Sequence, residues 1–501
     1  MKLPLASGSR LTLVDAGHDA VVLAPPPPVD EIADVAAAVR DALRFPLAGE
    51  PLEALVPRGG RATVVVELPI LPLPGSTTDP RRTAIAATME ELARAGVPLR
   101  NQTLLVAGGL ARRAGSRELE ALVPPELARR FHGHVEVHDA ESPDLVELGS
   151  VGRVPLRVSP ALLRTDAVVT ATAAETVING GPAALLGAAG AEALRAADAY
   201  SLLETAASRG WRMAVALEQA LARRVPVVGV SLTLNTPALT GILDGYPHDP
   251  AAVARVASFP VRGAFDLLPR MIRLRVLRRL PSEISAFAAF AGPPSVAHAE
   301  ALLRGVESRS ATVDSRLDAI CIGIPHVTPH VPREAPNPVL AAYLGLGLAL
   351  RLWRDAFPLV EGGTAILLSR FTRRFPHPTQ QPYRRLFQAF ASGAREPEEL
   401  VEVEREAASD ERALTAYRDG RAAHPLLPFA EWAACQPALG RLGAVLVAGC
   451  RDAMAARRLG FVPTRGVPAA LEMAHGRAGR PPRVGVLLSP PYFPLRVSDE
   501  S

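Results

Sequence analysis

Short apolar runs alternate with helical patterns along the whole chain, and this alternation constrains the fold more than any other feature. The run RATVVVEL from Arg61 has the continuous apolar character of a strand buried on both faces. Asp79 and Pro80 then supply the N-cap and first-turn residues of a helix that Gly96 ends. The next strand is TLLVA from Thr103. This order predicts a βαβ unit and therefore a parallel sheet.

The same alternation forms two series, one ending near residue 236 and one beginning near residue 318. We therefore predict the α/β class, with two α/β domains that have mainly parallel sheets and a ligand cleft between them. The predicted domains are 1–235 and 286–501, joined by a connecting insertion at 236–285. The other predicted strands are 134–139, 166–172, 225–234, 318–324, 364–369, 443–449 and 483–489.

The predicted insertion contains an arginine-rich helix. The segment LLPRMIRLRVLRRL at 267–280 interleaves five arginines with aliphatic residues, between Pro269 and Pro281. Such a helix can touch a membrane surface or a partner. It can also pack its aliphatic face on the protein body and leave the arginines in water, which is the interpretation that we favour.

Lysine is almost absent from the chain, since Lys2 is the only one. Lys and Arg total 55 against 51 Asp and Glu, so the net charge is +4 and nearly all of the positive charge is arginine. This small excess does not indicate a nucleic-acid partner. Without a second lysine, the chain cannot use a buried lysine as a base, a covalent anchor or a phosphate clamp.

The predicted compartment is the cytoplasm. Cys321, Cys435 and Cys450 are spread without metal-ligand spacing, which suits free thiols in a reducing environment. The N-terminal residues lack the apolar core of a signal peptide. The longest apolar stretch, Val339 to Leu350, is shorter than the ~20 residues that a transmembrane helix needs. The sequence leaves the oligomeric state open.

Common catalytic motifs are missing, and the histidines are weak candidates. GVSLT at 229–233 has Thr233 where a nucleophile elbow has its second glycine. His134 and His138 lie on one predicted strand face and are weak candidates for metal ligands, although no further ligand is evident. His326 and His330 follow a predicted strand end, where α/β proteins bind ligands, so we treat both as ligand-facing candidates.

Two glycine pairs give better signals. Gly108 and Gly109 follow the strand that starts at Thr103, and Gly180 and Gly181 follow the strand 166–172. Glycine at the carboxyl end of a strand permits positive φ and close approach of a ligand. The other interpretation is a tight turn alone, and the sequence does not decide between them. The ligand-facing candidates are Gly108, Gly109, Asn179, Gly180 and Gly181.

Several blocks in this order resemble the nickel-dependent lactate racemase family, with its N- and C-terminal domains. They include DEIADVAAAVRDALRFPLAGEPLEAL (30–55), ELARAGVPLRNQTLLVAGG (91–109), VEVHDAESPDLVELGSVGRVPLRVSPALLRTDAVV (135–169) and INGGPAALLG. In the second half they include FAGPPSVAHAEAL (290–302), GIPHVTPHVPREAPNPVLAAYLGL, VEGGTAILL and LGFVPTRGVPAALEMA (459–474). Their collinearity over nearly the whole chain carries the resemblance, apart from an insertion around 236–285.

The resemblance implies a nickel-pincer nucleotide that accepts hydride from a 2-hydroxy acid, two catalytic histidines, a tethering lysine and a nickel-binding histidine. This chain departs from each of these. Leucines or alanines occupy the matching positions, no histidine lies between His138 and His248, and the substrate-binding lysine of the second domain is also absent. The matching residues are Leu68 and Leu71 for an aspartate and an arginine, Leu110 and Ala173 for the histidines, Ala183 for the lysine and Ala199 for the nickel ligand.

Two main hypotheses follow. In the first, the chain keeps the lactate-racemase-like scaffold as a pseudoenzyme, lacks nickel-pincer hydride transfer and any cofactor, and binds a small ligand or protein partner in the cleft. The alternative is an active isomerase, a 2-hydroxy-acid racemase or epimerase with a noncovalently bound nickel-pincer nucleotide. A different chemistry in the same cleft is the third possibility. Losing a general base alone typically lowers the reaction rate by ~10²–10⁴. The loss of the base, the tether and the metal ligand together therefore favours the pseudoenzyme hypothesis.

Overall fold

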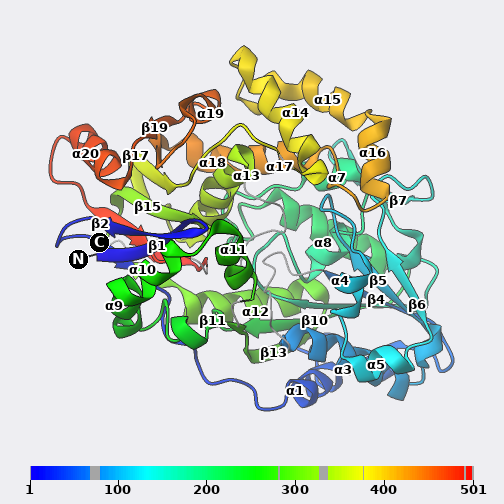
Figure 1. The fold of residues 1–501 in the computed structure, drawn as a ribbon. Coiled ribbons are helices and arrows are strands. Elements are labelled where there is room, and N and C mark those ends of the chain that lie inside the picture. The colour runs from blue at the N-terminus through cyan, green and yellow to red at the C-terminus, as the bar shows by residue number, and fades with distance from the viewer. Residues whose placement is uncertain are drawn as a thin grey trace.

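The protein is an α/β structure with two main sheets, as the sequence predicted. A computed structural model describes residues 2–67, 79–279, 282–325, 337–375, 377–489 and 492–498. One sheet lies around the cyan strands and the other around the blue and yellow-green strands in Figure 1. We call the part built on the first sheet the first half, and the part built on the second sheet the second half.

The first sheet has six strands, and helices cover both of its faces. Neighbouring strands are parallel, except that β13 is antiparallel to β10. Helices α1 (Val35–Arg44) and α3 (Pro80–Arg94) pack on one face, and α6 (Pro182–Leu186) and α8 (Arg209–Ala222) pack on the other. Because helices cover both faces of this sheet, consecutive residues of its strands are apolar. The strand order is β13 (Ala286–Gly292), β10 (Val227–Leu234), β9 (Ala167–Ala173), β4 (Ala62–Glu67), β5 (Gln102–Ala107) and β6 (His134–Val137).

The second sheet is also mainly parallel. Its main path runs β19, β18, β17, β15, β1 and β2, with β20 beside β15 and β3 beside β20. Helices α9 (Pro250–Ala257) and α20 (Val467–Ala478) pack on one face, and α13 (Pro338–Ala342) packs on the other. The strands are β1 (Lys2–Gly8), β2 (Arg10–Asp15), β3 (Val21–Leu23), β15 (Leu317–Pro325), β17 (Leu359–Leu368), β18 (Leu442–Ala448), β19 (Val462–Thr464) and β20 (Val484–Leu487).

The strands do not follow the predicted boundaries at 235 and 286. Strands β1 to β3 lie in the sequence before the first half but pair in the second sheet, where Ser7 lies opposite Ile324. Strand β13 comes after the insertion but pairs with β10 of the first sheet. Helix α12 (Pro294–Arg309) likewise packs on β10. The two halves therefore exchange chain segments. The paired strands lie far apart in the sequence, so no local sequence pattern predicts that they pair.

A helical excursion between β17 and β18 reaches across to the first half, at the upper right of Figure 1. Arg195 of the first half pairs with Glu404 of this excursion, with Nε and Oε1 2.5 Å apart. The Tyr417 hydroxyl donates to the Gly109 carbonyl at 3.3 Å. The excursion contains α14 (Gln381–Ala389), α15 (Val401–Ala408), α16 (Glu411–Arg418), α17 (Leu427–Ala433) and α18 (Gln436–Leu439).

The arginine-rich segment forms α11 (Arg270–Arg278), which follows α10 (Phe259–Leu267). The interpretation that all its arginines lie in water is wrong for Arg273, which is only 5% exposed. Arg273 donates from Nε to the Ser9 carbonyl at 3.0 Å and thereby fastens α11 to the β1–β2 hairpin. Conversely, Leu267 and Met271 are 84% and 78% exposed, so part of the apolar surface is not packed. Among the described helices, none is both long and apolar enough to cross a membrane.

Candidate functional site

A cavity lies between the two halves. The first half lines it with the loops that follow β9 and β10, and the second half with the helical turns Tyr343–Leu348 (η4) and Ala349–Arg351 (η5) and with the segment 492–494. Its empty volume is about 820 Å³, part of which is open to solvent. The lining residues are Glu175, Thr176, Ile178, Asn179, Leu202, Leu234, Asn235, Thr236, Pro237, Ile284, Arg309, Tyr343, Leu348, Leu352, Tyr492 and Pro494.

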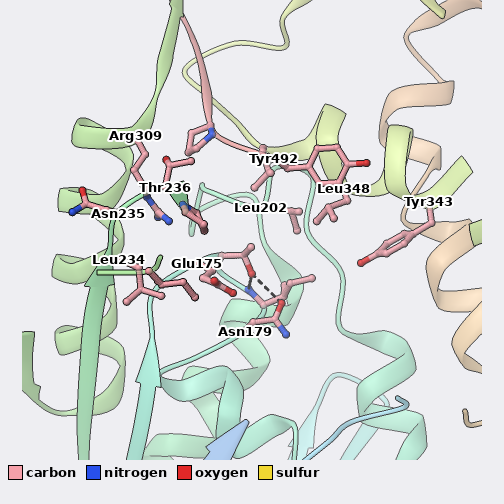
Figure 2. A pocket seen from close by; sticks show the side chains of 16 residues that line it. Glu175, Asn179, Leu202, Leu234, Asn235, Thr236, Arg309, Tyr343, Leu348 and Tyr492 are labelled. Carbon is pink, nitrogen blue, oxygen red and sulfur yellow. Dashed lines mark hydrogen bonds between the residues drawn. The ribbon is translucent and has the colours of Figure 1, made fainter. Parts of the chain in front are cut away.

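The polar groups of the cavity come from several elements. Figure 2 shows Arg309 and Tyr343 entering the cavity from opposite sides, with Glu175 and Asn179 between them. Tyr492 is only 6% exposed, and its hydroxyl has no hydrogen-bond partner within the described part of the chain. A buried hydroxyl without a partner is costly, and Tyr492 is one of the residues that line the cavity.

A network of charged groups adjoins the cavity. Arg81, at the start of α3, pairs with Asp79 at 2.7 Å and with Glu175 at 3.6 Å. Glu67 ends β4 and accepts a hydrogen bond from the Gly180 amide at 2.7 Å. Burial raises the pKa of Glu67 to about 7, and the negative charge of Glu175 adds to this rise. Near neutral pH, Glu67 can therefore hold or release a proton.

Burial also acts on the arginine of the cavity. It lowers the pKa of Arg309, and the charge of Glu175 opposes this effect. Arg309 donates to the carbonyl oxygens of Gly305 at 3.1 Å and Ala174 at 3.3 Å. These contacts hold the guanidinium at the end of α12, beside the loop that carries Glu175. The opposite charges of Arg309 and Glu175 make this part of the cavity close to neutral overall.

These charged residues were not among the candidates from the sequence. Glu67 is the last residue of an apolar strand and Glu175 is the second residue after another, so both meet the criterion that singled out the glycine pairs. Their positions at the carboxyl ends of neighbouring strands were thus a usable signal. Arg309 and Tyr492 had no such signal, because they reach the cavity only through the packing of the two halves.

Packing against α12 requires glycine at positions 180 and 181, and both residues also lie near the cavity. Both residues have positive φ, at 79° and 50°. A Cβ atom on Gly181 would lie 2.3 Å from Cβ of His298, and one on Gly180 would lie 2.6 Å from its Cε1. The pair is therefore required by the close approach of α12. Asn179, the residue before it, is among the residues that line the cavity.

His298 is fully buried and fixes this loop. Its Nε2 lies 2.9 Å from the Thr176 carbonyl, which can only accept, so Nε2 carries the proton. Its Nδ1 then accepts from the Ser231 hydroxyl at 3.1 Å. Burial lowers the pKa of His298 to about 4, so the ring is neutral at physiological pH. The sequence candidates did not include this residue, because a lone histidine in a helix gives no signal.

The pair Gly108 and Gly109 lies away from the cavity. The Gly109 amide donates to the Gly187 carbonyl at 3.1 Å, and its carbonyl accepts from Tyr417. A Cβ atom on Gly109 would lie 3.6 Å from Leu194, whereas one on Gly108 would meet no atom within 4 Å. The helical excursion thus covers this turn, and neither glycine is among the lining residues of the cavity.

The structure does not bring the candidate histidines together. His134 is exposed at the start of β6, whereas His138 is buried with Nε2 2.8 Å from the Ala189 carbonyl, and burial lowers its pKa. Within the described ranges, no three His, Cys, Asp or Glu residues are placed to hold a metal ion. His326 and His330 lie outside the described residues, and so do Leu68 and Leu71.

Comparison with known proteins gives a match over the first part of the chain. Residues 8–197 match the family model described as the lactate racemase N-terminal domain. These residues are therefore similar in sequence to that domain. No curated protein matches the chain.

A solved structure extends the likeness in fold to the whole chain. The lactate racemase apoprotein from Thermoanaerobacterium thermosaccharolyticum matches with a TM-score of 0.62 at 14% identity, over 99% of this chain and 100% of that chain. A Thermotoga maritima protein from a structural genomics programme has a TM-score of 0.48 at 11% identity, over 87% and 93% of the two chains. The first match shows that the chain has the lactate racemase fold.

The positions matched to lactate racemase chemistry are filled by buried apolar residues. Ala183, matched to the tethering lysine, is 4% exposed inside α6 and belongs to an apolar core cluster. Leu110, matched to a catalytic histidine, is 6% exposed and packs in a cluster with Tyr417. Ala173 and Ala199 are buried as well. Alanine and leucine side chains at these four positions can neither bind nickel nor form a covalent tether.

Substituting Gly181 tests whether the glycine pair is required by packing. We expect Gly181→Ala to lower the free energy of unfolding by roughly 2–4 kcal/mol, because the new Cβ meets His298 and the backbone strongly disfavours a side chain. Gly108→Ala is the matched control, since its Cβ meets open space. We expect it to change stability by less than about 1 kcal/mol. Equal losses in urea unfolding for both variants would contradict the packing argument.

Proposed function

We propose that this protein is a lactate-racemase-like pseudoenzyme that lacks nickel-pincer hydride transfer and binds a small molecule in the cavity between its halves. Two observations carry the proposal: Leu110 and Ala183 are buried and apolar, and the Tyr492 hydroxyl in the cavity lining has no hydrogen-bond partner among the described residues. No second lysine exists anywhere in the chain to replace the tether. We also propose that it works in the cytoplasm, without a cofactor and without a nucleic-acid partner.

The lining of the cavity favours a small, neutral, mainly apolar ligand with a hydrogen-bonding group. Half of the lining residues are aliphatic or proline, and the charges of Arg309 and Glu175 oppose each other. Tyr492 and Asn179 supply polar groups that can orient such a molecule. A carboxylate such as lactate would meet the negative charge of Glu175, while Arg309 already donates to two backbone carbonyls.

Acid–base chemistry in the same region is the second candidate, and Glu67 is the observation that favours it. A carboxyl group with a pKa near 7 is suited to general acid or base work. Its acceptor contact with Gly180 places it next to Asn179 of the cavity. An active racemase with a noncovalently held nickel-pincer nucleotide would need groups other than those at the matched positions.

Nickel content and lactate turnover test the loss of the family chemistry. We expect the protein, purified after co-expression with the enzymes that build the cofactor, to hold far less than one nickel per chain and not to interconvert the lactate enantiomers. Elemental analysis and a chiral lactate assay measure the two quantities, with an authentic lactate racemase expressed in parallel as the control. Stoichiometric nickel together with turnover would overturn the pseudoenzyme proposal.

Binding of hexanamide tests the cavity independently. This neutral amide has a short apolar chain, and we expect it at millimolar concentration to raise the melting temperature of the full chain. Leu348→Trp should abolish this rise by filling the cavity, whereas Leu303→Trp on the exposed face of α12 should keep it. A rise that persists in Leu348→Trp, or no rise in the wild type with hexanamide, would contradict binding in this cavity.

A further inference from the structure

Arginines gather at the carboxyl edge of the second sheet. Strands β18, β17, β15 and β1 are adjacent and parallel, so their carboxyl ends meet at one edge. Arg370 is the second residue after β17, and Arg451 is the third after β18. Arg10 begins β2, directly beyond the turn that follows β1. The carboxyl edge of an open α/β sheet is where such folds bind ligands.

Backbone contacts hold these segments side by side. The Asp452 amide donates to the Phe371 carbonyl at 3.2 Å, which joins the loops that carry Arg451 and Arg370. On the other side, the contact of Arg273 with the Ser9 carbonyl seats α11 on the hairpin that carries Arg10. Arg270 is the first residue of that helix. We call Arg10, Arg270, Arg273, Arg370 and Arg451 the arginine cluster.

The charges in this cluster repel one another. Burial lowers the pKa of Arg370, and the next four effects in size, from Arg451, Arg10, Arg273 and Arg270, all lower it further. Two nearby carboxylates already form ion pairs with arginines outside the cluster. Asp452 pairs with Arg373 at 2.5 Å, and Asp266 lies 3.5 Å from Arg262.

The hydrogen-bonding capacity of the cluster is largely unused. As far as the described chain extends, the guanidinium groups of Arg10, Arg270, Arg370 and Arg451 make no hydrogen bond or ion pair. Arg273 differs, because its donors serve backbone carbonyls. Four guanidinium groups with free donors, held together against mutual repulsion, are suited to an anion with several acceptor oxygens.

We propose that the arginine cluster is a binding site for the phosphate groups of a small phosphorylated molecule. A phosphate or pyrophosphate offers several charged oxygens to the planar fork of each arginine. None of the cluster residues lines the cavity between the halves, so this site does not depend on the proposed function. An anionic membrane is the competing ligand, because Leu267 and Met271 are exposed near Arg270.

Titration with inorganic pyrophosphate tests the proposal on the full chain. We expect calorimetry at ~50 mM salt to show one pyrophosphate per chain, with affinity falling as salt is added. Arg370→Gln and Arg451→Gln should each weaken binding at least about tenfold, since each removes a charged donor pair. Neither should lower the melting temperature without ligand, because each relieves repulsion. Arg223→Gln, at an exposed arginine after α8, should bind as the wild type does.

Four results would overturn the proposal. The first is no detectable pyrophosphate binding by the folded wild-type chain. The second is equal affinity of the wild type and both cluster variants. The third is sedimentation with phosphatidylserine vesicles that excess pyrophosphate does not reduce, which would assign the surface to a membrane. If both variants failed to fold without ligand, this result would also count against the proposal, because it would show that these arginines are required for folding.

Discussion

The contact between His298 and the turn at Gly180 and Gly181 is the constraint on which the central site depends. It allows α12 to approach the first sheet so closely that no side chain fits on Gly181. The same ring donates to the Thr176 carbonyl and so fixes the loop that presents Glu175 and Asn179 to the cavity. Eleven residues further along the helix, Arg309 enters that cavity. Helix α12 thus positions Arg309 directly and, through His298, the loop that carries Glu175.

Helix α12 also joins the two halves of the molecule. It packs on β10 of the first sheet, while its residues Ala301, Leu302 and Val306 belong to the main core of the second half. Strands β1 to β3 cross in the opposite direction and complete the second sheet. These exchanged segments hold the halves together, and Arg309 of α12 lines the cavity between them. The chemistry of the cavity therefore follows from packing between distant parts of the chain.

How much of this could be predicted from the sequence depended on the range of each contact. The strands and the α3 helix follow from local apolar patterns and from the Asp79–Pro80 start, and the structure confirms the α/β class. The crossing of β1 and β13 could not be predicted, because strand pairing between distant segments has no local signature. Among the residues that line the cavity, Asn179 was a sequence candidate because of its place after a strand. Glu67 was missed although it met the same criterion, and Tyr492 enters only through tertiary packing.

The central claim is that the position matched to the tethering lysine is now part of an apolar core. Placing lysine there is the most direct test. The account predicts that Ala183→Lys will unfold at markedly lower urea concentration than the wild type, because a buried ammonium without a partner is costly. Ala254→Lys, on the exposed face of α9, is the control and should be neutral. If Ala183→Lys instead kept wild-type stability and acquired stoichiometric nickel after co-expression with the cofactor-building enzymes, the account would be contradicted.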